Sequence, residues 1–76
     1  MRVAVTSRSF SKHPALRKEL LRRYPDAKVN DEGLSLSGAS LVSYLDGYQK
    51  AITALETIDD ATLLQLPDLT VIGKYG

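Results

Sequence analysis

Val3-Ala4-Val5-Thr6-Ser7-Arg8-Ser9-Phe10 is the stretch from which the architecture of this chain can be inferred. Its first half is a short, mainly β-branched run, typical of a strand that is covered on both faces of a sheet. Its second half is rich in hydroxyl side chains, and Ser9 and Ser11 are both suitable N-caps for a following helix. The stretch therefore predicts a strand that leads directly into a helix, the unit from which α/β proteins are built.

The same alternation continues along the chain. Leu16, Leu20 and Tyr24 recur at helical spacing as an apolar stripe, Pro14 suits the first turn, and Pro25 ends the helix. The expected strands are residues 3–6, 27–30, 51–55 and 70–72. A second helix is expected after Ser37, and Gly47 follows the end of that helix. A third helix is expected after Thr57, which forms a capping box with Asp60.

Strands separated by helices of this length form parallel pairs with right-handed crossovers. We therefore predict a single α/β domain over residues 1–76, of flavodoxin-like or half-Rossmann type, with three α-β-α layers. Its sheet has four parallel strands in the order 2-1-3-4. The polarity of residues 27–30 places the second strand at an edge of that sheet.

Composition limits the function classes. The 76 residues contain no cysteine and one histidine, which excludes a disulfide, a thiolate zinc site and a histidine cluster. The net charge of +1 gives no electrostatic reason to expect nucleic acid or an anionic membrane as a partner. The apolar runs are too short to span a bilayer. The chain opens directly with strand-like sequence, so we expect a cytoplasmic domain without a signal peptide.

Motifs of two common α/β functions are missing. The turn at residues 6–11 has no glycine, whereas a dinucleotide fingerprint needs Gly-x-Gly-x-x-Gly there. A phosphoryl-accepting receiver domain needs acids after its first and third strands, where this chain has Thr6-Ser7 and Ala54-Leu55-Glu56. The hydroxyls and Arg8 in the first turn favour helix capping and a solvated cation over a phosphate or carboxylate site, although the second interpretation stays open.

Four phrases carry a family resemblance, namely residues 3–10, 30–33, 51–56 and 69–76. In this order and spacing the chain resembles the N-terminal part of the D-isomer-specific 2-hydroxyacid dehydrogenases, the group that contains phosphoglycerate dehydrogenase. The resemblance implies a flavodoxin-like substrate domain. It also implies that NAD and the catalytic Arg, Glu and His belong to a separate Rossmann domain, so His13 has no catalytic role.

The resemblance also implies where substrate binds. Ala54, Leu55 and Glu56 match one edge of the family's substrate pocket. Tyr75 and Gly76 lead into the loop whose amides hold the substrate carboxylate. From the residues alone, Tyr75 beside two glycines is equally typical of a plain turn.

We therefore expect an N-terminal substrate-domain fragment of an NAD-dependent D-2-hydroxyacid dehydrogenase, whose substrate is a small 2-hydroxy or 2-oxo acid. It should contain no cofactor or metal site and no activity of its own. The alternative is a standalone flavodoxin-like module for binding or self-assembly. The resemblance also implies that the family's substrate domain has a further strand and helix after this loop, so truncation would leave an open edge at the last strand. We therefore expect self-association, as a homodimer or a swapped arrangement.

Overall fold

The computed structural model describes residues 1–54, 56 and 58–75 of the chain, with helices and strands in alternation. The elements in chain order are β1 (Val3–Val5), α1 (Arg8–Lys12), α2 (Pro14–Arg23), α3 (Gly38–Leu45), β2 (Lys50–Thr53), α4 (Asp60–Leu64) and β3 (Val71–Lys74).

The strands form one parallel sheet in the order β1-β2-β3. Ala4 of β1 lies opposite Ala51 of β2, which in turn lies opposite Ile72 of β3. The α/β class and the parallel sheet are thus confirmed. The described residues contain three strands, however, and the prediction of four is wrong.

The missing strand is the one expected at residues 27–30. Lys28 lies parallel to Ala4 in a single bridge: the Val5 amide donates to the Lys28 carbonyl at 2.7 Å and the Lys28 amide to the Val3 carbonyl at 2.9 Å. The next ladder bond would run from the Asn30 amide to the Val5 carbonyl.

Both groups of that next bond are occupied by side chains. The Asn30 amide donates to Ser11 Oγ at 2.9 Å, and the Val5 carbonyl accepts from the Tyr44 hydroxyl at 2.9 Å. The ladder therefore stops after one bridge. A side chain from each face of the sheet prevents the strand that the residue types at 27–30 favoured.

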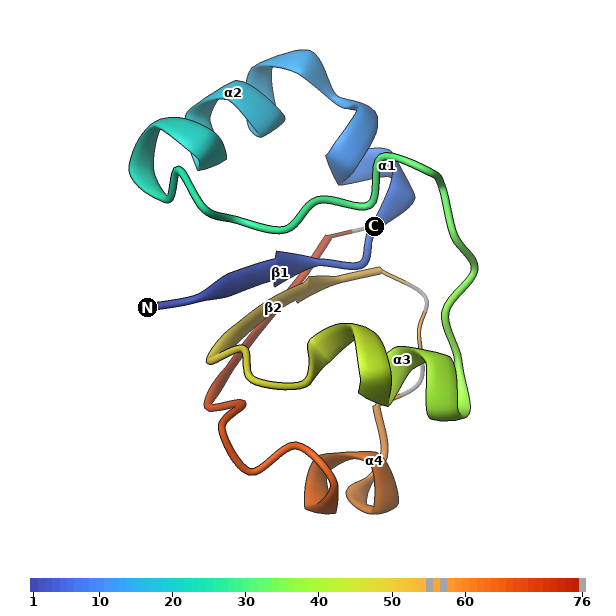
Figure 1. Ribbon diagram of the computed structural model, residues 1–76. Helices are drawn as coiled ribbons and strands as arrows, with labels where there is room; N and C mark the ends of the chain where they lie inside the picture. The colour runs from blue at the N-terminus through green and yellow to red at the C-terminus, as the bar shows by residue number, and fades with distance from the viewer. Residues whose placement is uncertain (55, 57, 76) are drawn as a thin grey trace.

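Helices cover the sheet on both faces (Figure 1): α1 and α2 lie on one face, α3 and α4 on the other. Because side chains alternate along a strand, neighbouring residues of β1 face different helices. Val3 and Val5 pack with Leu20 of α2. Ala4 packs with Leu41 and other residues of the α3 and α4 side. These two apolar layers hold the strands in place.

The first predicted helix is divided into α1 and α2 at His13. Ser7, rather than Ser9 or Ser11, caps α1 by accepting the Phe10 amide at 3.1 Å. His13 ends α1 and caps α2, where its Nδ1 accepts the Leu16 amide at 3.3 Å. Pro14 then occupies the first turn of α2, as predicted.

The ends of the later helices follow the predictions in part. Ser37 forms a capping box with Ser40 at the start of α3, and Gly47 follows its end with φ +83°, a conformation that favours glycine. The predicted Thr57 cap of α4 is wrong, because Asp59 caps this helix by accepting the Thr62 amide at 2.9 Å. Thr57 itself lies outside the described residues.

Candidate functional site

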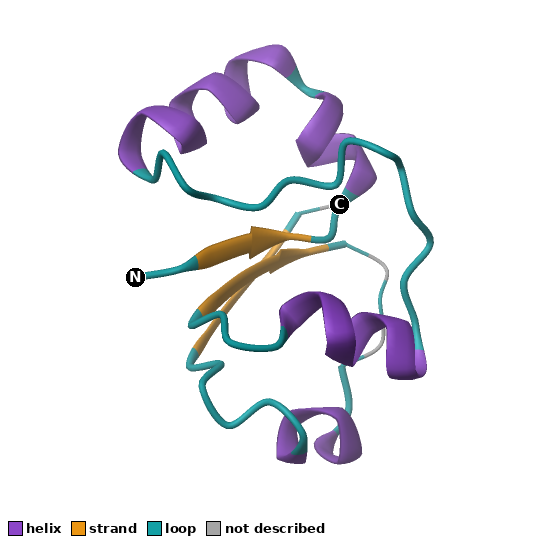
Figure 2. Cartoon of the chain, viewed as in Figure 1, coloured by secondary structure: helices purple, strands orange, loops and turns teal. Residues whose placement is uncertain are grey.

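The carboxyl ends of β1 and β2 form the place where a ligand is expected. After β1 the chain crosses through α1 and α2 to residue 28, at one edge of β1, and then returns through α3 to β2 at the other edge. In open α/β sheets, a crevice forms where connections from adjacent strands diverge in this way. Figure 2 shows the loop before α3 descending past this end of the sheet.

A cleft of about 170 Å³ lies there, which we call the carboxyl-edge cleft. Its lining residues are Arg8, Leu34, Ser35, Leu36 and Glu56. They come from the start of α1, from the loop before α3 and from the loop after β2. Three connections that are distant in sequence thus meet at one hollow.

Arg8 supplies the positive charge of the cleft. Its Cδ lies 3.9 Å from the position that a Cβ on Gly33 would occupy, so the side chain runs along a turn that Gly33 allows with φ +67°. Within the described residues, Arg8 forms no ion pair. Its guanidinium therefore has donors available for an anion.

Asn30 holds the loop that carries Leu34. Its side-chain Nδ2 donates to the Thr6 carbonyl at 2.8 Å and to the Leu34 carbonyl at 2.9 Å. Its Oδ1 accepts the Leu34 amide at 2.9 Å. One buried amide group thus ties the loop to the carboxyl end of β1. Asn30 is a positioning residue of the cleft.

The predicted substrate residues after β2 lie partly in this cleft. The carboxylate of Glu56 turns back toward the strand end, where its Oε2 accepts the Ala54 amide at 2.7 Å. This bond fixes a carboxylate beside the hollow that Arg8 also lines. Leu55 lies outside the described residues.

Tyr75 occupies a different place. Its amide donates to the Thr53 carbonyl at 2.6 Å, and its ring packs edge-on against Phe10 at 5.4 Å between centroids. It lies at the same end of the sheet but does not line the carboxyl-edge cleft. Gly76 lies outside the described residues.

The hydroxyls of the first turn are used within the fold. Ser7 caps α1, and Thr6 Oγ1 donates to the Ile52 carbonyl at 3.4 Å. This confirms the capping interpretation for Ser7. Arg8 is exposed, as predicted, but it lines the cleft as well.

Sequence reasoning missed the contribution of Asn30 and of residues 34–36. A signal was present, because the single asparagine of the chain follows a strand-like run and precedes Asp31-Glu32-Gly33, a typical turn. The sequence could not reveal that this turn folds back against β1.

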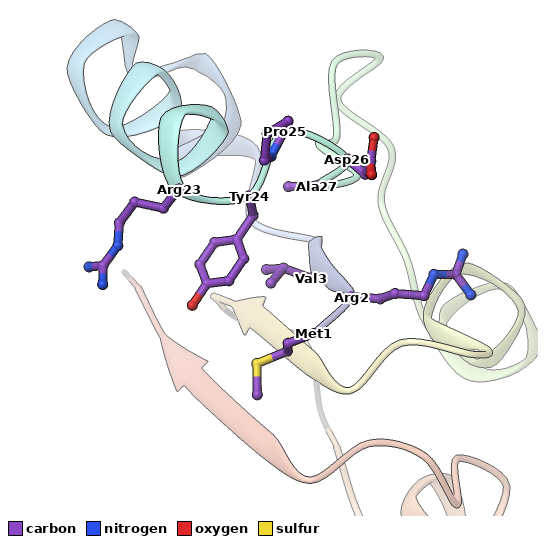
Figure 3. A pocket seen from close by; sticks show the side chains of 8 residues that line it. All are labelled: Met1, Arg2, Val3, Arg23, Tyr24, Pro25, Asp26 and Ala27. Atoms are coloured by element: carbon purple, nitrogen blue, oxygen red, sulfur yellow. The ribbon is translucent and has the colours of Figure 1, made fainter.

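A larger hollow, of about 470 Å³, lies at the opposite end of the strands and includes Arg2, Arg23 and Tyr24 (Figure 3). Its two arginines point away from one another. Arg2 instead stacks over the Tyr48 ring at 4.4 Å and donates to the Gly47 carbonyl at 3.2 Å. The two cationic side chains of this hollow therefore do not converge on one ligand position, so its size does not make it the better site.

No family model, curated protein or solved structure matches this chain. The resemblance to 2-hydroxyacid dehydrogenases therefore stays a prediction. Over the described residues there is no group of three potential metal ligands, and no helix there has the length and apolar character needed to cross a membrane.

Proposed function

We propose that this chain is the substrate-side domain of an NAD-dependent D-2-hydroxyacid dehydrogenase, with a flavodoxin-like, half-Rossmann arrangement. The position of Lys28 supports this arrangement, because it lies beside β1 on the edge away from β2. Residue 28 thus lies where the second strand of the 2-1-3-4 order would lie, but it forms a single bridge and no strand. The proposed substrate is a small 2-hydroxy or 2-oxo acid.

The observation that carries the proposal is Arg8 in the carboxyl-edge cleft. A guanidinium binds a carboxylate through two parallel hydrogen bonds, and this one has no ionic partner within the described residues. Glu56 lines the same cleft, and its carboxylate can accept a hydrogen bond from a 2-hydroxyl group. A cation for the acid group and an acceptor for the hydroxyl are the two contacts that a small hydroxy acid requires.

The family resemblance adds the loops at residues 54–56 and 75–76 to this site. Ala54 and Tyr75 lie at the same end of the sheet as the cleft, each at the end of a strand. NAD would be held by another domain, since the glycines of this chain do not form a dinucleotide fingerprint. The chain alone therefore binds substrate weakly and transfers no hydride.

Binding is tested by titrating lactate and pyruvate into the isotope-labelled chain and following amide chemical shifts. We expect saturable shifts at residues 8 and 34–36, with a dissociation constant on the order of 1 mM, and none with the neutral lactamide. Arg8→Ala should weaken binding about tenfold or more, because a charge-assisted bond contributes about 1.5–3 kcal/mol.

Arg23→Ala is the matched control, since it removes the same charge from an exposed position that lines the other hollow. Equal losses in the two variants would mean that only net charge matters and would refute the Arg8 site. Turnover of NAD(H) by the purified chain would refute the claim that it is inactive alone.

The alternative proposal, a standalone binding or self-assembly module, is favoured by one observation. Among the described residues, strand β3 lies at the edge of the sheet and has exposed apolar side chains. This feature is unusual for a monomeric domain. The cytoplasmic location and the lack of a nucleic-acid or membrane partner remain predictions from composition.

A further inference from the structure

Strand β3 has one side without a partner in the described part of the chain. The Val71 amide donates to the Gln49 carbonyl at 3.1 Å and the Tyr75 amide to the Thr53 carbonyl at 2.6 Å. In a parallel ladder the backbone groups of alternate residues face the same neighbour, so Gly73 also faces β2. The backbone groups of Ile72 and Lys74 therefore face outward from the sheet.

The side chains at this edge are apolar on both faces. Val71 is 40% exposed and Ile72 is 45% exposed, and they point to opposite faces because they are neighbours in a strand. Edge strands in soluble proteins usually carry a central charge, a proline or a bulge that prevents pairing. Here the one charge within β3 is Lys74, its last residue.

We propose that β3 pairs in antiparallel orientation with β3 of a second copy of this chain. The twofold axis passes between the two Ile72 residues, which exchange both of their outward hydrogen bonds. The two sheets then become one sheet of six strands. In this register Val71 lies opposite Gly73 of the partner, and Lys74 lies opposite the partner's Thr70.

The register follows from the shape of the edge. A Cβ placed on Gly73 would meet no atom within 4 Å, so open space lies beside this residue. The exposed Val71 of the partner occupies that space in the proposed register. The Val71–Gly73 pair is also the closer, non-hydrogen-bonded type, with Cα atoms about 4.5 Å apart, which suits one large and one absent side chain.

Charge favours a second copy as the occupant. Lys74 is the last residue of β3, and Asp68 lies in the turn that precedes the first residue of β3. Antiparallel pairing brings each Lys74 toward the partner's Asp68, and it does so twice by symmetry. The net charge of +1 per chain adds little repulsion between copies.

The proposal is independent of the dehydrogenase function. The carboxyl-edge cleft lies at the end of β1 and β2, whereas the open edge is the far side of β3. If the chain did not bind lactate, the proposed pairing through β3 would not be refuted. If the chain were monomeric, the proposed substrate site in the carboxyl-edge cleft would not be refuted.

Cross-linking tests the register, because the chain has no cysteine of its own. In the proposed dimer the two Ile72 Cα atoms lie about 5.5 Å apart, within the range that a disulfide spans. Ile72→Cys should give a covalent dimer under mild oxidation. Leu34→Cys is the control at nearly equal exposure, 43%, and should react at least ten times more slowly. Equal rates would overturn the register.

Light scattering tests the association itself. We expect the native chain to pass from monomer to dimer as its concentration rises, and Ile72→Lys to weaken the dimer at least tenfold, because two ammonium groups would face one another. Leu34→Lys, which adds the same charge at similar exposure, should dimerise like the native chain. A native chain that is monomeric at every concentration, or a dimer that Ile72→Lys leaves intact, would overturn the proposal.

A charge exchange keeps the test valid if Ile72→Lys fails to fold. Asp68→Lys should weaken the dimer and Lys74→Asp should do the same, while the double variant restores it. Circular dichroism of each variant establishes that the fold is retained. A double variant that is no better than the single variants would refute the proposed contact between Lys74 and the partner's Asp68.

Discussion

Replacement of Asn30 by alanine is the change that most directly tests how the carboxyl-edge cleft is built. The buried side chain makes three hydrogen bonds, one to the Thr6 carbonyl and two to the backbone of Leu34. Alanine removes all three and leaves the Asn30 amide bond to Ser11 in place. The effect should therefore fall on the loop before α3 more than on the sheet.

The expected magnitude follows from where the partners lie. A net hydrogen bond contributes about 1 kcal/mol, so three give about 3 kcal/mol. Water can replace the two bonds to Leu34, which is exposed, but the carbonyl of the fully buried Thr6 is left with a desolvation cost of about 1–3 kcal/mol. The free energy of unfolding should fall by about 2–4 kcal/mol, out of about 4–11 kcal/mol for a domain of this length.

Urea unfolding followed by circular dichroism measures this loss, and amide hydrogen exchange locates it. The Leu34 amide should lose protection in Asn30→Ala, while the Ala51 amide of β2 stays protected relative to global unfolding. Gln65→Ala is the control, because it removes one exposed bond of 3.3 Å and should change stability by less than about 0.5 kcal/mol. An Asn30→Ala chain that is as stable as the control would refute the assignment of Asn30 as the residue that positions the loop.

Three further predictions follow from single contacts. Burial raises the pKa of the Tyr44 hydroxyl to about 12, so the folded state keeps this proton while an unfolded tyrosine loses it near pH 10. Stability should therefore fall as the pH rises from about 10 to 12, and the late step in a tyrosinate absorbance titration should vanish in Tyr44→Phe. Gly47→Ala should lower the free energy of thermal unfolding by about 1 kcal/mol, since φ is +83° and Arg2 Nη1 lies 3.1 Å from the new Cβ. Gly73→Ala meets no neighbour within its own chain and should not lower the stability of the monomer, measured at a concentration too low for the proposed pairing. Asp31→Asn removes the exposed ion pair with Arg17 and should cost less than about 1 kcal/mol, an effect that high salt abolishes when unfolding is repeated at several ionic strengths.

The sequence was sufficient for the features that depend on local chemistry. Apolar β-branched runs indicated β1, β2 and β3, and Ser37 and Gly47 marked the two ends of α3. Each of these signals is carried by a few adjacent residues whose conformational preferences are strong.

The features that depended on distant contacts could not be predicted. The strand expected at residues 27–30 fails because Tyr44 and Ser11, which are remote in sequence, take the hydrogen bonds it would need. The cleft was found only in part for the same reason. Glu56 was nominated from its place after a strand, but its meeting with Arg8 and residues 34–36 depends on how the Asn30 side chain folds the loop.

The two edges of the sheet differ in a way that bears on assembly. At the β1 edge, the Lys28 bridge takes the Val5 amide and the Tyr44 hydroxyl takes the Val5 carbonyl, while Lys28 Nζ lies 3.9 Å from the centre of the Tyr44 ring. A strand arriving there would find its backbone partners occupied and a charge in the way. At β3 the corresponding groups of Ile72 face outward with apolar side chains around them. In the proposed pairing through β3, the described residues offer no second open edge, so association would stop at two copies rather than continue edge to edge into a filament.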